Sequence, residues 1–529
     1  MLRTFLLLVL VLAALLFSFF GITRSLRHDE CCSVEIASTS WPGIIENLKV
    51  NAHTPPLYYF LLNLWMKLFG ASEAALRSLS AVFYILSIFA VYRLGKTLYD
   101  KKTGLLAAFL FMVSPMAIWH AQDGRMYSLL PFLGILSTLY FFRLFFRSSG
   151  SKTDFALYLL VNTLGTFTHY WFFFILAAQG AAVLLLVFRS AFKKFLAATV
   201  ISVLPFLGLW ISVFLQQLGN SGTSWMDKPA ASAFFSTLLT FYGGGKLGFL
   251  VYAAVLTLVL VEIRPNKMKL LNPSLLKAFL QQKQNLALLI LVFVSLAVPL
   301  MISQVKPIYV ENRYTIIAVP SLALFLGAFL NRFAGKAPLL VFSSVLLSGV
   351  LVSFVYKRIR LPAITHRSIS EYIFSRANRN DILVLSTSSR PGIEYYLHRN
   401  DLVSNFTKFS FPSEMAVHPC WTWLRQWLSE KERLANEADS LVKIIDSLAR
   451  DSTAKIWLVY GGFPEVEAII TNKFKHDFLS LTEKDLDPLY RQFRNDFRVY
   501  QKKSSPGPSD GKYFPHSRET SPRTENPVP

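Results

Sequence analysis

Long apolar runs recur along most of this chain, and they restrict its fold more than any other feature. A helix needs about 20 mostly apolar residues to cross a bilayer, although about 17 can suffice. Eleven runs reach or approach that length, which predicts a polytopic α-helical membrane protein with about 11 transmembrane helices, in a range of 11–13. The predicted spans are Thr4–Ile22, Ala74–Tyr92, Gly104–Trp119, Met126–Phe142, Phe155–Thr168, Tyr170–Phe188, Phe195–Leu215, Leu247–Val261, Leu286–Ile302, Tyr314–Leu330 and Pro338–Val355.

Composition agrees with a membrane protein and argues against two other classes. Charged residues are only 16% of the 529 residues, whereas a soluble surface needs roughly 25%. The net charge of +22 lies in short clusters between apolar runs, so it indicates membrane topology and no nucleic-acid partner. Three cysteines exclude a disulfide scaffold. A bridge from Cys31 or Cys32 to Cys420 stays an alternative to three plain thiols, which we favour.

The short apolar run Leu57–Phe69 decides the topology. If it does not span, every basic loop between later spans falls on one side, which the positive-inside rule assigns to the cytoplasm. We therefore expect it to lie along the outer interface. The first run, Thr4–Ile22, is followed by no small-x-small cleavage site, so we read it as a retained helix. These choices predict a multi-pass protein of the inner (plasma) membrane, with its site and C-terminal part on the extracytoplasmic side.

The composition changes near residue 360, which predicts three domains. Residues 1–360 form the transmembrane domain. Residues 361–503 read as a small soluble extracytoplasmic α/β domain, with buried strands at 382–385 and 456–460 and a helix at Trp421–Ala449. Residues 504–529 are rich in Ser, Pro and charge, which is typical of a disordered tail.

Unusual polar residues gather at helix ends on the predicted outer side. A transporter more often places such groups in the middle of its spans, at broken helices. The distribution therefore favours an enzyme that works at the outer membrane surface. The groups are Asp29-Glu30, His53-Thr54-Pro55-Pro56, Gln122-Asp123-Gly124-Arg125, His169-Tyr170-Trp171 and Glu311-Asn312-Arg313-Tyr314.

Five segments in this order resemble the bacterial GT-C-type membrane glycosyltransferases, in particular the family 39-like group. That group is similar to protein O-mannosyltransferases, the lipid A aminoarabinose transferase and rhizobial lipopolysaccharide glycosyltransferases. The segments are "DE" at 29–30, "HTPPLYYFLLNLWMKLFGASEAALRSLSAVF" at 53–83, "SPMAIWHAQDGRMYSLL" at 114–130, "THYWFFFILAAQ" at 168–179 and "KPIYVENRY" at 306–314. The resemblance implies a sugar donor carried on a polyprenyl phosphate, membrane lipids as surroundings, and an acceptor outside the cytoplasm: lipopolysaccharide, another envelope glycan or a protein.

The resemblance also implies roles for the acidic residues. Inverting transfer needs a base beside the acceptor hydroxyl, and Asp29 matches the family's acidic residue after the first helix. Glu30 is the second choice for this role, since a solvated helix-flanking charge explains it nearly as well. Asp123 stands where these relatives usually have Glu; it either orients the acceptor or joins Asp29 in holding a divalent cation. We assign no certain cofactor.

The basic residues suit the donor's leaving group. A lipid phosphate is already a stable anion, so it needs positive charge and hydrogen-bond donors more than a strong acid. Arg can bind two phosphate oxygens at once, which Lys cannot. The expected donor and substrate residues are Arg125 and Arg313, then His53, Lys306, His169 and Tyr314.

Two rival functions stay open at this stage. A ligase or polymerase that transfers a whole lipid-linked glycan would share the topology and the basic outer loops. A flippase or transporter of lipid-linked sugars would place charges inside the spans, which are nearly free of them.

Overall fold

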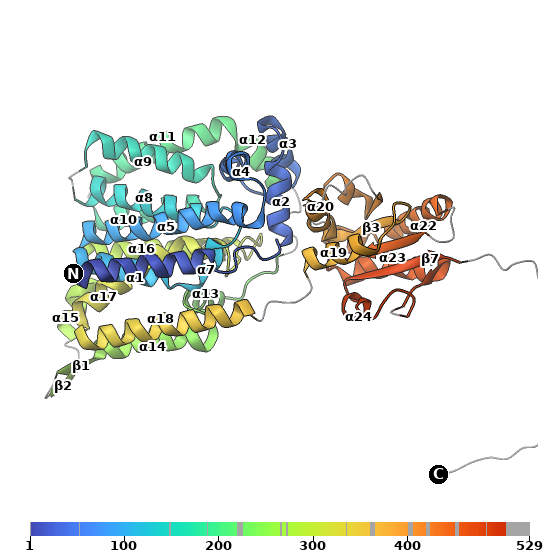
Figure 1. The fold of residues 1–529 in the computed structure, drawn as a ribbon. Coiled ribbons are helices and arrows are strands. Elements are labelled where there is room, and N and C mark those ends of the chain that lie inside the picture. Colours follow the sequence, from blue (N-terminus) through green and yellow to red (C-terminus); the bar gives the residue numbers. More distant parts are fainter. Residues whose placement is uncertain are drawn as a thin grey trace, which may run out of the picture.

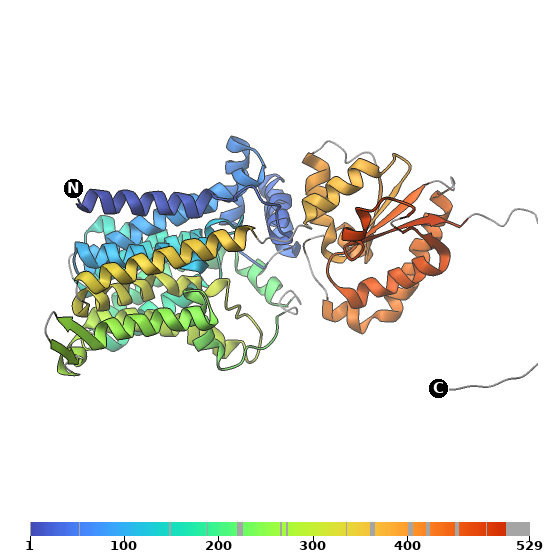
Figure 2. The same ribbon diagram turned by 60° about the horizontal axis from the view of Figure 1, so that its bottom comes forward.

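A helix bundle and a smaller α/β domain make up the protein, joined end to end (Figure 1). The structure is a computed structural model. It describes residues 2–51, 53–147, 150–187, 189–219, 226–264, 267–270, 273–334, 336–359, 365–399, 406–418, 420, 424–449, 454–482 and 484–503. The predicted tail, 504–529, lies outside the described residues. Figure 2 shows the two bodies from a second direction, again joined end to end.

Every predicted span overlaps a helix of the bundle. The long bundle helices are α1 (Leu2–Phe19), α5 (Glu73–Leu98), α6 (Lys101–Met112), α8 (Leu129–Phe141) with the π-helix η1 (Phe142–Phe146), α9 (Lys152–Thr166), α10 (Phe172–Leu186), α11 (Arg189–Leu209), α14 (Gly245–Leu260), α16 (Lys283–Ile302), the 3-10 helix η2 (Tyr314–Ala318) with α17 (Val319–Phe333), and α18 (Lys336–Ile359). Among the described residues, five helices are long and apolar enough to cross a membrane, or seven if two bent helix pairs each count as one span. The polytopic membrane fold predicted from the sequence is confirmed.

The span predicted at Gly104–Trp119 is not one straight helix. It consists of α6 and α7 (Pro115–Ala121), which meet at an angle of 66°. The cause is local, because Pro115 lacks a backbone donor and keeps Ser114 out of the helical region, while the Ser114 hydroxyl caps the N-terminus of α7. The bend turns the 122–125 loop toward the end of the bundle.

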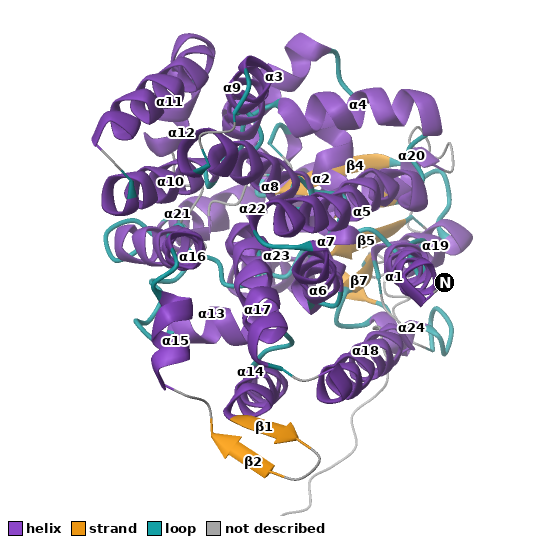
Figure 3. Cartoon of the chain, turned by 90° about the vertical axis from the view of Figure 1, so that its left-hand side faces the viewer, coloured by secondary structure: helices purple, strands orange, loops and turns teal. Residues whose placement is uncertain are grey.

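Three helices between α1 and α5 lie across one end of the bundle. They are α2 (His28–Ala37), α3 (Trp41–Asn51) and α4 (Leu57–Phe69). Figure 1 shows α4 nearly end-on and α2 upright, whereas the bundle helices run across the view; in Figure 3, seen along the bundle, α4 runs across instead. This transverse course agrees with the interfacial position expected for Leu57–Phe69. Helices α2 and α3 were not predicted from the sequence.

Shorter elements complete the bundle. At the same end as α2 lie α12 (Ile211–Gly219) and α13 (Ala233–Phe241). At the opposite end lie the hairpin β1 (Val261–Arg264) and β2 (Lys267–Leu270) and the helix α15 (Pro273–Leu280).

The C-terminal domain is an α/β sandwich with a five-stranded mixed sheet, as the sequence predicts. The strands are β3 (Ile382–Ser386), β4 (Thr407–Phe411), β5 (Lys455–Val459), β6 (Phe478–Ser480) and β7 (Phe497–Lys502), in the order β4-β3-β5-β7-β6. β3 pairs in parallel with β4 and β5, whereas β7 is antiparallel to both of its neighbours. The helical elements are α19 (His366–Arg376), η3 (Thr387–Ser389), α20 (Arg390–Arg399), η5 (Ser413–Ala416), α21 (Leu424–Ser429), α22 (Lys431–Leu448), α23 (Pro464–Asp477) and α24 (Tyr490–Phe493). The helix predicted at Trp421–Ala449 is thus divided at Glu430, and residues 421–423 lie outside the described part.

The α/β domain rests on α2 and on the start of α5. The Tyr396 hydroxyl accepts a hydrogen bond from the Leu26 amide at 3.0 Å. Glu73, the first residue of α5, pairs with Arg367 and Arg399 of the α/β domain. The domain therefore contacts the same helix that carries the Asp29-Glu30 pair.

Candidate active site

Asp29 and Arg313 form an ion pair at the end of the bundle where α2 lies. The distance from Asp29 Oδ2 to Arg313 Nη1 is 2.9 Å, and about a third of each side chain is exposed, 36% and 33%. Burial opposes ionisation of Asp29, but the charges of Arg125, Arg313 and His28 outweigh it and hold its pKa below the usual range. The predicted base and the predicted phosphate ligand are therefore direct neighbours, and both remain accessible.

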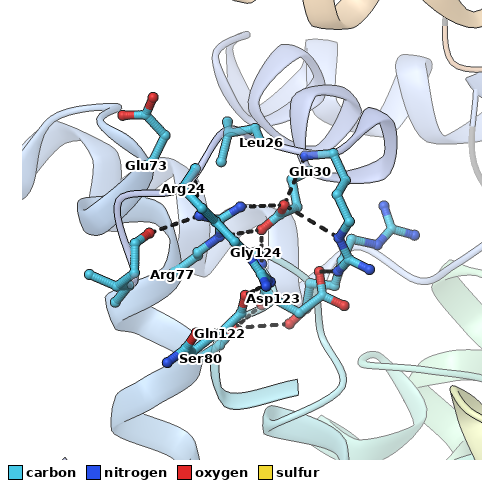
Figure 4. A network of polar contacts seen from close by, with 12 residues as sticks. Arg24, Leu26, Glu30, Glu73, Arg77, Ser80, Gln122, Asp123 and Gly124 are labelled. Atoms are coloured by element: carbon cyan, nitrogen blue, oxygen red, sulfur yellow. Dashed lines mark hydrogen bonds and ion pairs between the residues drawn. The ribbon is translucent and has the colours of Figure 1, made fainter. Parts of the chain in front are cut away.

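Glu30 has a different environment from Asp29. Its carboxylate is buried and accepts two hydrogen bonds from Arg77, each 2.7 Å long. It also accepts backbone hydrogen bonds from Arg27 at 2.9 Å and from Gly124 at 3.0 Å. Figure 4 shows this network around Glu30. Both carboxylate oxygens are occupied by protein donors, and the carboxylate is not solvated.

Arg77, also fully buried, ties the chain entering α2 to the bundle. Its guanidinium donates to the carbonyl oxygens of Ile22, Arg24 and Ser25, at 2.6–3.0 Å. Arg77, a charged residue near the start of the predicted span Ala74–Tyr92, thus supports the position of α2.

Asp123 is buried and paired with side chains that sequence analysis missed. Arg27 Nη2 lies 2.7 Å from its Oδ1, and His120 Nδ1 lies 3.4 Å from its Oδ2. Burial opposes ionisation, yet Arg27, His120 and Arg125 keep the pKa of Asp123 below the usual range. His120 Nε2 also contacts the Asn312 carbonyl at 3.0 Å, which connects the 122–125 loop to the segment that carries Arg313. The i,i+3 spacings of Arg27–Glu30 and His120–Asp123 could have predicted these contacts from the sequence.

Arg125 lies between α2 and the ring of Tyr127. Its Nη1 donates to the Asp29 carbonyl and to the Ser33 hydroxyl, both at 3.2 Å. Its guanidinium also lies 5.9 Å from the ring centre of Tyr127. Burial opposes the charge of Arg125, but the neighbouring phenols and carboxylates raise its pKa well above the usual value, so it contributes a fixed positive charge beside Asp29.

A large apolar cavity adjoins this charged cluster. Its volume is about 480 Å³, within the usual range for ligand sites. Most of its lining is apolar: Trp171, Phe173, Phe174, Phe206, Leu207, Ile211, Phe214, Leu218, Met226, Ile302 and Ile308. Tyr170 and Gln217 also line it, together with four of the predicted substrate residues: His53, His169, Lys306 and Tyr314. Tyr127 connects the two parts, since its ring lies 5.9 Å from Tyr314 and 6.3 Å from His169.

The two cavity histidines are held neutral. Burial, then the charge of Lys306, lowers the pKa of His53 to about 4. Burial, then the charge of Arg125, lowers the pKa of His169 to about 3. The Nδ1 atom of His169 accepts a hydrogen bond from the Trp171 amide at 3.1 Å, so its Nε2 carries the proton and acts as a neutral donor. Lys306 donates to the Leu218 carbonyl.

The arrangement does not favour the divalent cation that the sequence left open. Asp29 and Asp123 are each paired with an arginine, Arg313 and Arg27 respectively. The described residues include no group of three or more His, Cys, Asp or Glu side chains placed to hold a metal ion. We therefore derive no step that uses a metal.

Comparisons with known proteins agree with this fold. The profile of the dolichyl-phosphate-mannose-protein mannosyltransferase family matches residues 53–216. The crystal structure of ArnT from Cupriavidus metallidurans in the apo state aligns with a TM-score of 0.61 and 12% identity. The ArnT structure with bound undecaprenyl phosphate aligns with a TM-score of 0.62 and 12% identity. Each alignment covers 94% of this chain and 98% of ArnT. A search of curated protein sequences found no match.

The family match begins at His53 and includes Asp123, Arg125 and His169, so it covers part of the described cluster. The structural likeness extends over both the bundle and the α/β domain. Together they confirm the resemblance inferred from the sequence: this chain is a multi-pass membrane protein with the GT-C glycosyltransferase fold.

Proposed function

We propose that the protein transfers a single sugar from a polyprenyl-phosphate donor to an acceptor outside the cytoplasm, with inversion at the anomeric carbon. The observation that carries this proposal is the position of the Asp29–Arg313 pair beside an apolar cavity lined by four polar substrate candidates. An apolar cavity suits the first units of a polyprenyl chain, and guanidinium groups suit the phosphate. ArnT, which has the same fold, has been crystallised with undecaprenyl phosphate.

In this proposal Asp29 is the base. The acceptor hydroxyl oxygen attacks the anomeric carbon, its proton passes to an Asp29 carboxylate oxygen, and the lipid phosphate leaves as an anion. Asp29 is ionised in the absence of substrate, because Arg125 and Arg313 hold its pKa low. When a donor phosphate binds Arg313, part of that positive charge is neutralised, and Asp29 becomes a stronger base at the time it is needed.

Arg125 and Arg313 hold the leaving phosphate from two sides. Arg313 reaches the accessible side of Asp29, whereas the half-buried Arg125 contacts the Asp29 backbone and faces Tyr127. The neutral His169 donates a hydrogen bond without adding charge, and Lys306 adds a cation at the cavity wall. Positive groups placed in a partly dry site stabilise developing negative charge more strongly than in water.

The test is a transfer assay on the purified protein in nanodiscs with defined lipid-linked donors. We expect turnover with a single-sugar polyprenyl-phosphate donor, and loss of turnover in Asp29→Asn. Turnover only with a lipid-linked oligosaccharide would mean that the protein is a glycan ligase or polymerase. Movement of the donor across the bilayer without transfer would mean that it is a flippase. Lipidomics of a deletion strain identifies donor and acceptor by the sugar that disappears and the lipid that accumulates.

We also propose that α2 and the α/β domain face away from the cytoplasm. The basis is the set of short basic loops that the spans place on the other side. Single cysteines at the exposed positions Ser40 and Ser447, introduced into a variant without native cysteines, test this in intact cells. An impermeant maleimide should label both. Labelling of only one would contradict the placement of Leu57–Phe69 along the interface.

A further inference from the structure

One face of α2 presents a histidine, a cysteine and a glutamate to the α/β domain. His28, Cys32 and Glu35 follow one another at i, i+4 and i+7, so they share one side of the helix. Cys420 of the α/β domain meets this side, with its Sγ 3.6 Å from Glu35 Oε2. Residues three apart on a helix are neighbours, with about 5–6 Å between their Cβ atoms. Cys420 also interacts with Cys32, the residue one turn before Glu35, so the two thiols lie side by side although they are distant in sequence.

The surroundings of Cys32 favour its thiolate form. His28 Nε2 lies 3.5 Å from Cys32 Sγ, and His28 Nδ1 contacts the Ser388 carbonyl at 3.0 Å. The carbonyl requires a proton on Nδ1, so Nε2 faces the thiol and can accept its proton. Burial opposes ionisation of Cys32, but the neighbouring Cys420 thiol and the charge of His28 lower its pKa to about 6. The same pairing, against the effect of burial, raises the pKa of His28 to about 9.

We propose that Cys32 and Cys420 are a redox pair that forms a disulfide between α2 and the α/β domain when a disulfide oxidant reaches them. The placement of Cys420 against the helix face of Cys32 and Glu35 carries this assignment. We assign the pair to Cys32 and not to Cys31, because Cys420 interacts with the Cys32 thiol. The buried Cys31 thiol is influenced mainly by Cys32, Glu30 and Arg77. The inference does not depend on the proposed function.

The reaction balances with an external disulfide as oxidant, such as oxidised glutathione or an oxidised dithiol protein. The Cys32 thiolate attacks one sulfur of that disulfide, forms a mixed disulfide and releases one thiolate. Cys420 passes its proton to Glu35, which already accepts its hydrogen bond, and then attacks the Cys32 sulfur. A second thiolate leaves. Two protein thiols are oxidised, one external disulfide is reduced, and the two protons end on the two released thiols.

Such a bond would fix the α/β domain to the helix that carries the site. Cys32 is three residues from Asp29, on a helix of only 10 residues. In the reduced state the described contacts across this boundary are hydrogen bonds, ion pairs and apolar packing. The disulfide would add a covalent contact close to Asp29, and neither cysteine lines the apolar cavity.

The experiment oxidises the reduced full-length protein in detergent with oxidised glutathione, then counts free thiols after denaturation with a maleimide mass tag. Intact mass and peptide mapping identify the product. The matched variants are Cys31→Ser, Cys32→Ser and Cys420→Ser, each checked by gel filtration for an unchanged folded peak. We expect the wild type and Cys31→Ser each to lose two free thiols and two hydrogen atoms, with a cross-linked 32–420 peptide. Cys32→Ser and Cys420→Ser should form no internal bond.

Three outcomes would overturn the assignment. The first is that the wild type retains all three thiols after oxidation. The second is a cross-linked peptide that contains Cys31 in place of Cys32. The third is a stable glutathione adduct on Cys32 with Cys420 still free, which would show that the two sulfurs do not meet.

Discussion

Asp29 and Glu30 are adjacent in sequence, yet they belong to two regions with different physical properties. The first region is the buried network beneath α2, where Glu30 accepts four hydrogen bonds, two of them from Arg77. The second is the accessible cluster beside the cavity, where Asp29 meets Arg313 and both side chains stay about one-third exposed. A carboxylate and a guanidinium form the central pair in each region.

Burial, and the number of hydrogen bonds that the carboxylate already accepts, decide what such a pair can do. In the buried region every oxygen of Glu30 has a protein donor, so no lone pair is left for a substrate proton. In the accessible region the strongest favourable charge near Arg313 is that of Asp29. An incoming phosphate can compete with Asp29 for the Arg313 guanidinium. One region therefore fixes the position of α2, and the other is available for chemistry.

Replacing the accessible carboxylate should produce the largest change. Asp29→Asn should lower the rate of sugar transfer by about 10²–10⁴-fold, the usual range for a positioned acid–base group. Its thermal unfolding in detergent should stay close to that of the wild type, because the side chain is partly exposed and has one ion-pair partner. A large loss of thermal stability in this variant would mean that Asp29 belongs to the structural region.

The buried carboxylate should show the opposite behaviour. Glu30→Gln should destabilise the bundle by about 3–5 kcal/mol, because it leaves the Arg77 charge buried without a counterion. Thermal unfolding and yield in detergent measure this loss. The control is the double variant Glu30→Gln with Arg77→Met, which removes both charges and should recover part of the stability. If Glu30→Gln is stable but inactive, Glu30 is the base and the assignment is reversed.

The architecture could be predicted from the sequence because hydrophobicity and charge act over long segments. Apolar runs of span length and basic loops are averages over many residues, so single exceptions do not obscure them. The course of Leu57–Phe69 followed from its short length together with the loop charges. The bend at Ser114–Pro115 was also readable, since Pro disfavours the helical region for the residue before it. It was missed because hydropathy alone was used to define that span.

The division of roles within the site could not be predicted in the same way. It depends on which side chains meet across elements far apart in sequence, such as Glu30 with Arg77 and Asp29 with Arg313. No local pattern specifies that Glu30 is buried and Asp29 accessible, since neighbouring helix positions differ by about 100° in direction. The helices α2 and α3 were missed for a related reason: α2 has almost no separation of polar and apolar faces, because it is contacted from several sides.

Removing the guanidinium partner of Asp29 should lower transfer less than removing the carboxylate itself. Arg313→Ala should lower transfer by about 10–100-fold at low donor concentration, the scale of one or two charge-assisted hydrogen bonds. Arg313→Lys should lose less, because a point charge remains but the two-pronged contact does not. The pKa of Asp29 should rise in Arg313→Ala, since Arg313 lowers it in the wild type. The acid limb of the pH profile should therefore move to higher pH.

The double variant Arg125→Ala with Arg313→Ala tests whether both arginines hold one phosphate. Its loss should be smaller than the product of the two single losses if they share that ligand. Steady-state transfer against donor concentration in nanodiscs measures all three variants. Donor dependence that is unchanged in both single variants would make Arg313 an interfacial anchor and remove it from the site.

The smallest effect is expected at the boundary with the α/β domain. Glu73 pairs there with Arg367 and Arg399, whose side chains are 33% and 46% exposed. Glu73 itself is buried, but Gln is uncharged there and both arginines can turn to water, so Glu73→Gln should cost about 1 kcal/mol, near the upper limit for exposed ion pairs. Hydrogen exchange in α19 and α20 should become faster, while the bundle stays unchanged. A loss as large as that of Glu30→Gln would show that docking of the α/β domain stabilises α2 as strongly as the buried network does, and the two regions would then be one cooperative unit.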